Sequence, residues 1–204
     1  MDYSKVAKRD VVEHVIAELS KRNIDAVFVS NREAAKEKVL SLIPKGFEVF
    51  TMSSITLHET GIADAINNSS DYVSVRNKLN SMSRETQGRE MQVLGAAPQM
   101  AVGSVHAVTE DGDVYIASNT GSQLPAYAYG ADRVIWVVGT QKIVPDANAA
   151  LDRIYTYILP KESVRLSEQY HAQLTSNVSK LLIVHKEFTP GRVTIVFVDE
   201  QLGF

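Results

Sequence analysis

Short apolar runs that alternate with amphipathic helical stretches constrain the fold of this chain more than any other feature. Residues 24–30 (IDAVFVS) and 133–139 (RVIWVVG) are apolar at nearly every position, which is typical of strands buried on both faces. Residues 47–52 (FEVFTM) form a third β-prone run. Residues 4–22 and 31–43 carry apolar side chains at helical spacing. This alternation predicts an α/β fold with a parallel sheet.

Later segments add further elements to this pattern. A Pro-Asp pair is typical of a helix start and predicts a helix over residues 146–158. Residues 102–118 predict a two-stranded hairpin whose turn lies at 110–113. Residues 180–204 predict two more strands, joined by a Thr-Pro-Gly turn at 189–191.

These elements together predict a three-layer α/β domain over residues 1–204. Its mixed, mostly parallel sheet carries antiparallel hairpins, and an N-terminal helix within residues 1–22 packs on it. With 45% hydrophobic residues, a chain of 204 residues has enough apolar surface for one such core.

Charge and cysteine content exclude several classes of function. The net charge of −3 argues against nucleic acid or an anionic membrane as the main partner. The chain has no cysteine, so it has no disulfide, no thiolate nucleophile and no cluster ligated by its own sulfur. The polar start has no apolar leader segment, and the apolar runs are too short to cross a bilayer. We therefore expect a cytoplasmic protein.

Common cofactor signatures are absent from the sequence. No two glycines are spaced G-x-G, there is no G-K-[ST] motif, and there is no H-E-x-x-H motif. The five histidines are scattered along the chain. We therefore expect no nucleotide cofactor and no metal site in this chain.

A hydroxyl-rich turn follows the third apolar run and is the first candidate site. Ser53, Ser54 and Thr56 lie where a strand leads into a helix, and ligands of open α/β sheets bind at such positions. Free backbone N–H groups and hydroxyl donors favour an anion there. Thr56 and Glu59 also match the T-x-x-E capping box, which explains both residues without a ligand. The two interpretations are compatible, because a cap satisfies only some of the free N–H groups.

A second candidate follows the strand of the predicted hairpin. It consists of small or amide-bearing residues that would let backbone approach a ligand: Asn119, Thr120, Gly121, Ser122 and Gln123. A plain surface turn uses the same residue types. Both candidates follow strands that can end at one edge of the sheet, so we expect them to face each other across a site.

Three segments in this order resemble the LUD-domain family, the lactate-utilisation C-type group. They are TLHETG (56–61), AVTEDGDVYIAS (107–118) and SQLPAYAYGADRVIWVVGTQKIVPDANAALDRI (122–154). The resemblance implies a fold like that of ribose-5-phosphate isomerase, glucosamine-6-phosphate deaminase and the CoA-transferases. Enzymes of that group bind phosphate or acyl-CoA on loops at the carboxyl edge of the sheet. On that analogy Ser53, Ser54 and Thr56 match a phosphate-binding loop.

The chain departs from the family pattern at two places. The family hairpin reads as an acid followed by Thr-Gly-Thr, whereas here Glu110 is followed by Asp111, Gly112 and Asp113. Glu110 is the acid that the resemblance implies, with Glu59 as a second candidate, but the added aspartates crowd Glu110 with like charge. We therefore expect that Glu110 is not the covalent nucleophile that CoA-transferase chemistry needs. Gln123 replaces a leucine of the family's Ser-Leu-Leu-Pro motif.

The resemblance implies a role in the conversion of L-lactate to pyruvate beside iron–sulfur partner subunits. Without cysteine, this chain would be an accessory or ligand-binding component that binds a small anionic or phosphorylated metabolite. A free-standing isomerase or CoA-transferase and a regulatory or scaffolding module are the alternatives. The sequence is compatible with catalytic and non-catalytic roles, and with a homo-oligomer.

Overall fold

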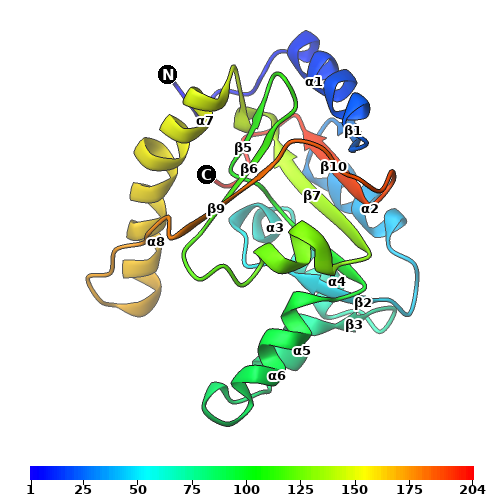
Figure 1. The fold of residues 1–204 in the computed structure, drawn as a ribbon, viewed down its shortest axis with the longest axis vertical. Coiled ribbons are helices and arrows are strands. Elements are labelled where there is room, and N and C mark those ends of the chain that lie inside the picture. Colours follow the sequence, from blue (N-terminus) through cyan, green and yellow to red (C-terminus); the bar gives the residue numbers. More distant parts are fainter.

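The computed structural model describes residues 1–204 and contains ten strands and eight α-helices (Figure 1). The strands are β1 (Asp25–Val29), β2 (Glu48–Thr51), β3 (Val73–Ser74), β4 (Met100–Gly103), β5 (Ala107–Thr109), β6 (Val114–Ser118), β7 (Arg133–Gly139), β8 (Ile143–Val144), β9 (Lys180–Val184) and β10 (Val193–Val198). The α-helices are α1 (Arg9–Lys21), α2 (Arg32–Leu42), α3 (Ile55–Glu59), α4 (Ile62–Asn67), α5 (Val75–Asn80), α6 (Arg84–Ala96), α7 (Ala147–Asp152) and α8 (Leu159–Tyr170). Other helical turns are η1 (Ala126–Gly130), η2 (Thr140–Lys142) and η3 (Arg153–Ile158).

The main sheet has six strands in the order β1-β10-β7-β4-β2-β3, and every pair in it is parallel. Its central strand β7 is buried along almost its whole length, as its continuous apolar sequence predicts. Trp136 and Val138 face one core cluster, whereas Ile135 and Val137 face another. Both faces of this sheet are therefore covered.

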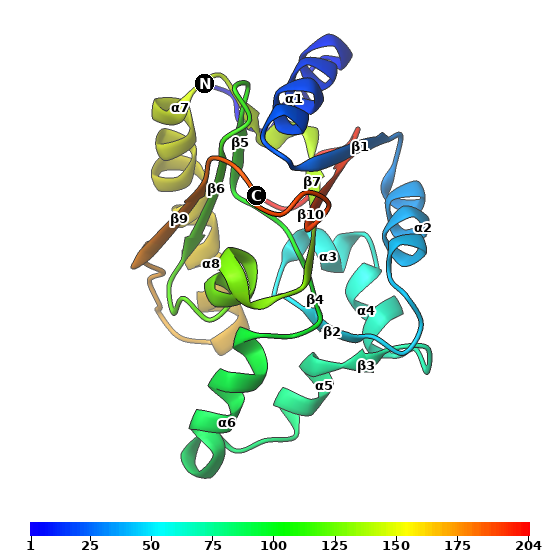
Figure 2. The ribbon, with the colours of Figure 1, turned by 45° about the vertical axis from the view of Figure 1, so that its right-hand side comes forward.

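Helices α2, α3 and α4 cover one face of the main sheet, through side chains such as Val39, Leu57 and Ile66. The other face packs against α1 and against a second sheet, which has the order β8-β5-β6-β9. Strands β6 and β9 lie side by side in Figure 2, with the α7–α8 region beside them. The fold is thus a three-layer α/β core whose second sheet is backed by α7 and η3.

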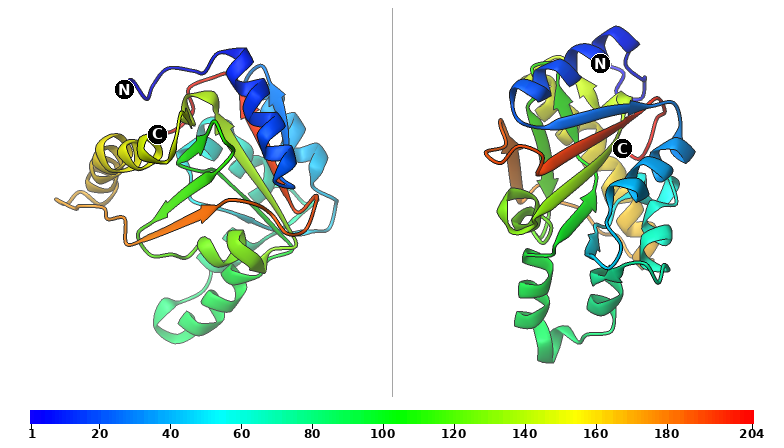
Figure 3. Two further views of the ribbon diagram at one scale, coloured as in Figure 1. Left: turned by 45° about the horizontal axis from the view of Figure 1, so that its top comes forward. Right: turned by 90° about the vertical axis from the view of Figure 1, so that its right-hand side faces the viewer.

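Asparagine and serine side chains begin several of these helices. Asn31 caps α2, since its side chain accepts a hydrogen bond from the Ala34 N–H at 2.9 Å. Helices α5 and α6 form a lobe that extends away from the sheets, at the bottom of Figure 1. The C-terminus lies near the centre of the view in Figure 2, and beside the yellow helical region of α7 in the left view of Figure 3. No helix has both the length and the apolar composition needed to cross a bilayer.

The strand predicted over 24–30 exists, but its predicted burial on both faces is wrong. β1 pairs only with β10, so it is an edge strand, and its side chains are only partly covered. Its apolar sequence reflects packing against α1 and α2 at the edge of the sheet. The guanidinium of Arg9 also lies 3.8 Å from the centre of the Phe28 ring.

The predicted hairpin at 102–118 differs from the structure, whereas both strands predicted within 180–204 are present. Of residues 102–118, the first two belong to β4 in the main sheet, and only β5 and β6 form the antiparallel hairpin. The strands predicted within 180–204 are β9 and β10, which lie in different sheets. β9 and β10 do not pair with each other, because β9 joins β6 in the second sheet and β10 joins β1 and β7 in the main sheet.

Helix bounds are close to those predicted, with one extension. The N-terminal helix begins at Arg9 rather than at residue 4, and the second spans Arg32–Leu42. The helix predicted over 146–158 does not end there. It continues through the π-helical segment η3 into α8, so helical structure runs from Ala147 to Tyr170.

Candidate functional site

One large cavity opens at the carboxyl edge of the main sheet. Its volume is about 1370 Å³, and residues that follow β2, β4, β6 and β7 line it together with residues of α5, α6 and α8. Backbone polar groups are free where strands end, so this edge is the usual ligand-binding position of an open parallel sheet.

The structure brings the two predicted candidate segments together at this cavity. Its lining includes all eight residues of the two segments: Ser53, Ser54, Thr56, Asn119, Thr120, Gly121, Ser122 and Gln123. Ser53 lies two residues after β2 and is exposed, whereas Thr56 is only 1% exposed. The two segments come from different sheets, which meet at this edge.

The predicted capping box at Thr56 and Glu59 is wrong, because Ser54 is the N-cap of α3. Its Oγ accepts a hydrogen bond from the Leu57 N–H at 3.4 Å. The Thr56 hydroxyl instead donates to the Leu202 carbonyl oxygen at 3.2 Å. The Glu59 carboxylate accepts from the Gly203 N–H at 2.7 Å. Both side chains therefore hold the C-terminal tail rather than the start of their own helix.

The loop after β6 is held by hydrogen bonds among its own side chains. The Ser118 hydroxyl donates to Oε1 of Gln123 at 2.9 Å and accepts from the Gly121 N–H at 2.8 Å. Gly121 has φ +84°, which favours glycine, and the aliphatic chain of Lys180 fills the space where a Cβ would lie. Gln123, the departure from the family motif, thus supports the shape of this loop.

Lys142 is the residue of the cavity that the sequence reasoning missed. It ends the short turn η2 that follows β7, and it is only 3% exposed. Its Nζ atom donates to Thr56 Oγ1 at 3.0 Å and to Ser104 Oγ at 3.1 Å. Burial, followed by the positive charge of Arg153, lowers the pKa of Lys142 to about 7, although Glu59 opposes this. Ligands of open α/β sheets bind where strands end, and Lys142 lies three residues after the buried strand β7. Its position in the sequence could therefore have identified it.

Two further polar residues lie beneath Lys142. Burial lowers the pKa of His106 to about 3, with smaller contributions from Lys142 and Arg153, so this imidazole is neutral. Its Nδ1 accepts the Ala117 N–H at 3.1 Å, which ties β6 to the segment after β4. Arg153 is fully buried and donates to the His106 carbonyl oxygen at 2.6 Å. Its charge lies behind the cavity wall rather than in the lining.

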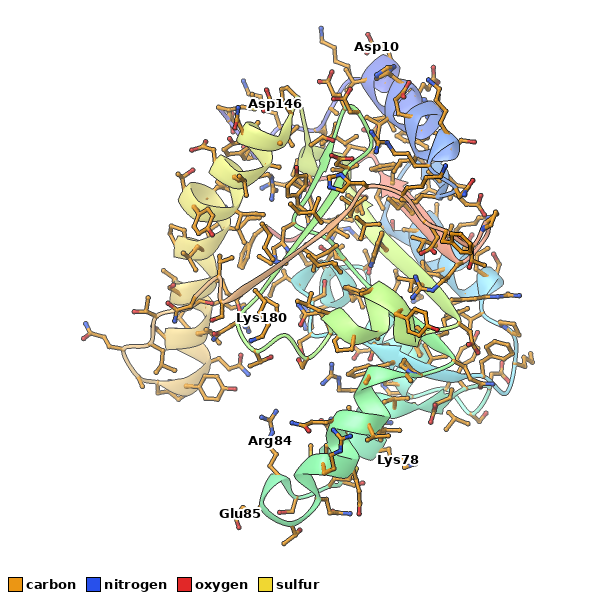
Figure 4. All side chains as sticks on the ribbon, in the orientation of Figure 1. Asp10, Lys78, Arg84, Glu85, Asp146 and Lys180 are labelled. Carbon is orange, nitrogen blue, oxygen red and sulfur yellow. The ribbon has the colours of Figure 1, made fainter.

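Basic side chains dominate the charged lining of the cavity. Its charged residues are Arg76, Arg84, Arg89, Lys142, Arg165 and Glu162. The single carboxylate, Glu162, already binds Arg165 through hydrogen bonds of 2.6 and 2.7 Å. Figure 4 shows Arg84 near the tip of the α5–α6 lobe. A chain with a net charge of −3 therefore concentrates positive charge around one cavity, which favours an anionic ligand.

Arg76 is the most constrained of these arginines. Its Nε and Nη2 atoms donate to the Thr51 carbonyl oxygen at 3.1 and 2.7 Å, and its guanidinium lies 4.8 Å from the centre of the Phe50 ring. Desolvation lowers its pKa, and no carboxylate pairs with it. Arg76 thus presents a fixed positive charge beside the end of β2.

The two candidate acids lie outside the lining of the cavity. Glu110 is at the turn end of the β5–β6 hairpin, where its backbone N–H donates to the Val144 carbonyl oxygen. The loop 119–123 lies at the other end of β6. Glu59 is occupied by the backbone of Gly203. The prediction that Glu110 is not a nucleophile stays a prediction, but its position separates it from the cavity.

A family model for the LUD domain matches residues 12–198. The chain belongs to the LUD domain family. The match spans both sheets and every strand, so the lining of the cavity at the edge of the main sheet lies almost wholly within the LUD domain.

This LUD protein shares its fold with a solved structure of TM-score above 0.5. A DUF162 family protein from Deinococcus radiodurans has a TM-score of 0.57 and 11% identity, with 95% of this chain and 99% of that chain covered. The eIF2B β subunit from Chaetomium thermophilum has a TM-score of 0.37 and 16% identity, with 67% of this chain and 43% of that chain covered. The search of curated proteins found no match.

Proposed function

We propose that this LUD protein binds a small anionic or phosphorylated metabolite in the cavity at the carboxyl edge of its main sheet. The observation that carries the proposal is the charge of the lining, where three arginines have no carboxylate partner and the single carboxylate is already paired. An anion entering this cavity would meet uncompensated positive charge and the hydroxyls of Ser53 and Ser54. The lining has no carboxylate other than Glu162 that could repel the anion.

Membership of the LUD family supports a lactate-utilisation type of role. We propose that the protein acts as an accessory or ligand-binding component in the metabolism of L-lactate and pyruvate, with separate subunits supplying any iron–sulfur cluster. Both L-lactate and pyruvate are small carboxylates, which is the charge class that the cavity favours. The cavity is large for either of them, which leaves room for a longer phosphorylated ligand.

The CoA-transferase alternative has less support than anion binding. That chemistry needs a carboxylate nucleophile at the site. Glu162 is held by Arg165, and Glu110 lies outside the lining. A sugar-phosphate isomerase type of activity does not require a covalent carboxylate nucleophile. The phosphate of its substrate would also suit the arginines of the lining.

A thermal-shift screen tests the proposal. L-lactate, pyruvate, ribose 5-phosphate and inorganic phosphate are added separately to the full chain at constant ionic strength. A ligand at 100 times its Kd stabilises the folded state by about 2.7 kcal/mol, which raises the Tm of a chain of this size by roughly 5–10 °C. We expect at least one of the anions to do so.

Two arginine variants make the screen specific to the cavity. Arg89→Gln removes an exposed charge from the lining and should weaken the shift, whereas Arg133→Gln removes an exposed charge outside it and should not. A shift that both variants weaken equally, or no shift with any anion, contradicts the proposal.

A further inference from the structure

We propose that Lys142 is a nucleophilic amine that captures the carbonyl carbon of an anionic oxo compound as an imine inside the cavity. The substrate class is a small aldehyde or ketone that also carries a carboxylate or a phosphate. This inference rests on the proposed function, because the basic lining would attract the anionic group while Lys142 reacts with the carbonyl.

The first support is the unusual setting of the amine. Lysines are almost never buried unless they are paired with an acid. Lys142 is only 3% exposed, and no carboxylate lies within salt-bridge distance of its Nζ. Two hydroxyl oxygens are its only hydrogen-bond partners, and the residue still lines the cavity. An ammonium ion is poorly stabilised in such a setting, whereas a neutral amine fits it.

The hydrogen-bond directions also suit a neutral amine. The hydroxyl hydrogen of Thr56 is directed to the Leu202 carbonyl oxygen, so its Oγ1 accepts from Nζ. The other acceptor available to the Ser104 hydroxyl, the Val105 carbonyl oxygen, is 3.4 Å away. Nζ therefore donates to both hydroxyl oxygens, which uses two hydrogens and leaves the lone pair of a neutral amine free for attack.

The surroundings hold the amine in one place. Gln141, the neighbouring residue, donates from Nε2 to the Leu202 carbonyl oxygen at 2.8 Å and thereby fixes the turn that carries Lys142.

Among the charged groups nearby, Arg153 disfavours the ammonium form of Lys142 and Glu59 favours it, while His106 is neutral. Desolvation outweighs both charges and leaves a large neutral fraction near pH 7.

The proposed step balances without an oxidant or a reductant. The Nζ lone pair attacks the carbonyl carbon and forms a C–N bond, and the π electrons of the C=O bond move to oxygen. The nitrogen loses a proton and the oxygen gains one, which gives a carbinolamine. Loss of water then breaks the C–O bond and leaves an imine. The hydroxyls of Thr56 and Ser104 touch the nitrogen whose protons must move.

Reductive trapping tests the inference. The full chain is incubated at pH 7.5 with sodium cyanoborohydride and with pyruvate, pyridoxal 5′-phosphate or acetone, and peptide mapping by mass spectrometry measures labelling of each lysine. We expect pyruvate or pyridoxal phosphate to label Lys142 at least tenfold faster than exposed Lys36. Acetone, which has no charge, should label Lys142 more slowly. Labelling of Lys142 no faster than that of Lys36, or equally fast labelling by acetone, overturns the inference.

Two variants serve as controls for the labelled residue and for its hydroxyl partner. Lys142→Met should abolish the fast-labelled site, and its melting curve reports whether it folds. Ser104→Ala keeps the lysine, removes one hydroxyl partner, and should slow the labelling of Lys142 several-fold; unchanged labelling there counts against the role given to the hydroxyl. If pyruvate or phosphate raises the Tm of the wild-type protein but Lys142 is not labelled, the inference fails and the proposed function stands. If neither occurs, both fail.

Discussion

The Nζ atom of Lys142 lies 3.0 Å from Oγ1 of Thr56, so the end of β7 is joined to the first turn of α3 across the carboxyl edge of the main sheet. Thr56 in turn donates to the Leu202 carbonyl oxygen. This chain of contacts connects three segments that are far apart in the sequence. It places a buried amine, a hydroxyl and the C-terminal tail beside the basic cavity.

The buried amine predicts a pH-dependent stability. The pKa of Lys142 is about 7 in the folded state, against 10.5 for an unperturbed lysine. The unfolded state therefore binds more protons between these values, and the folded state gains stability as the pH rises from 7 to 10.5. Relative to Lys142→Met, the free energy of unfolding of the wild-type protein should increase by up to about 1.4 kcal/mol per pH unit in that window.

Urea denaturation of both proteins at pH 7, 8, 9 and 10 measures this difference. Subtracting the curve of the variant removes the contributions of other titrating groups. A difference that is flat across the window, or that falls as the pH rises, contradicts the placement of Lys142 as a desolvated amine.

Gly203 should be intolerant of a side chain for a steric reason. A Cβ there would lie 2.6 Å from Thr56 Oγ1 and 3.5 Å from Lys142 Nζ. Gly61 has the same φ of +63°, but a Cβ there would meet nothing within 4 Å. Both alanine variants carry the same backbone strain, of roughly 1–2 kcal/mol. Only Gly203→Ala must also displace the C-terminal tail, so we expect it to lose roughly 1–3 kcal/mol more.

Urea denaturation of the two glycine variants gives the comparison. Equal losses for Gly203→Ala and Gly61→Ala would show that the tail does not pack on Thr56. Gly203→Ala should also change the labelling rate of Lys142, because the tail contacts the same threonine.

Gly103, at the end of β4, leaves room for a buried tyrosine. A Cβ on Gly103 would lie 1.7 Å from the hydroxyl oxygen of Tyr127 and 3.0 Å from its ring. Tyr127 is 2% exposed and packs edge-on against Trp136, with ring centres 5.5 Å apart. We expect Gly103→Ala to cost roughly 2–3 kcal/mol of stability through overpacking.

A double variant tests the cause of that loss. Tyr127→Phe removes the atom that clashes most, so Gly103→Ala should cost less when it is combined with Tyr127→Phe than when it is made in the wild-type protein. Equal costs in the two backgrounds, measured by urea denaturation, would contradict this packing.

The sequence predicted the strand–helix alternation because burial imposes it on consecutive residues. The strand at 133–139 is a clear case, since both of its faces are covered and every position after Arg133 had to be free of polar side chains. The strand at 24–30 was misjudged because an edge strand packed by two helices has a similar composition. The pairing of the predicted hairpin with β8 and β9 could not be predicted, because these strands meet through long-range contacts that leave no periodic pattern.

The candidate site was partly predictable for the same reason. The Ser53 turn and the loop at 119–123 follow strands, and the structure places both at one cavity. The capping prediction at Thr56 failed because the C-terminal tail, far along the chain, offers that hydroxyl a better partner. The proximity of Arg76, Arg89 and Arg165 depends on how three helices pack around the cavity, which local sequence does not encode.

An NMR titration with potassium phosphate at constant ionic strength tests the central claim, that this cavity binds anions, most directly. Backbone amide signals of the ¹⁵N-labelled chain report where the anion binds. The account predicts saturable shifts concentrated at residues 53–56, 104–106 and 119–123, which line the cavity. Absent shifts, or shifts that grow linearly and spread over exposed residues outside the cavity such as Lys36 and Arg133, would contradict it.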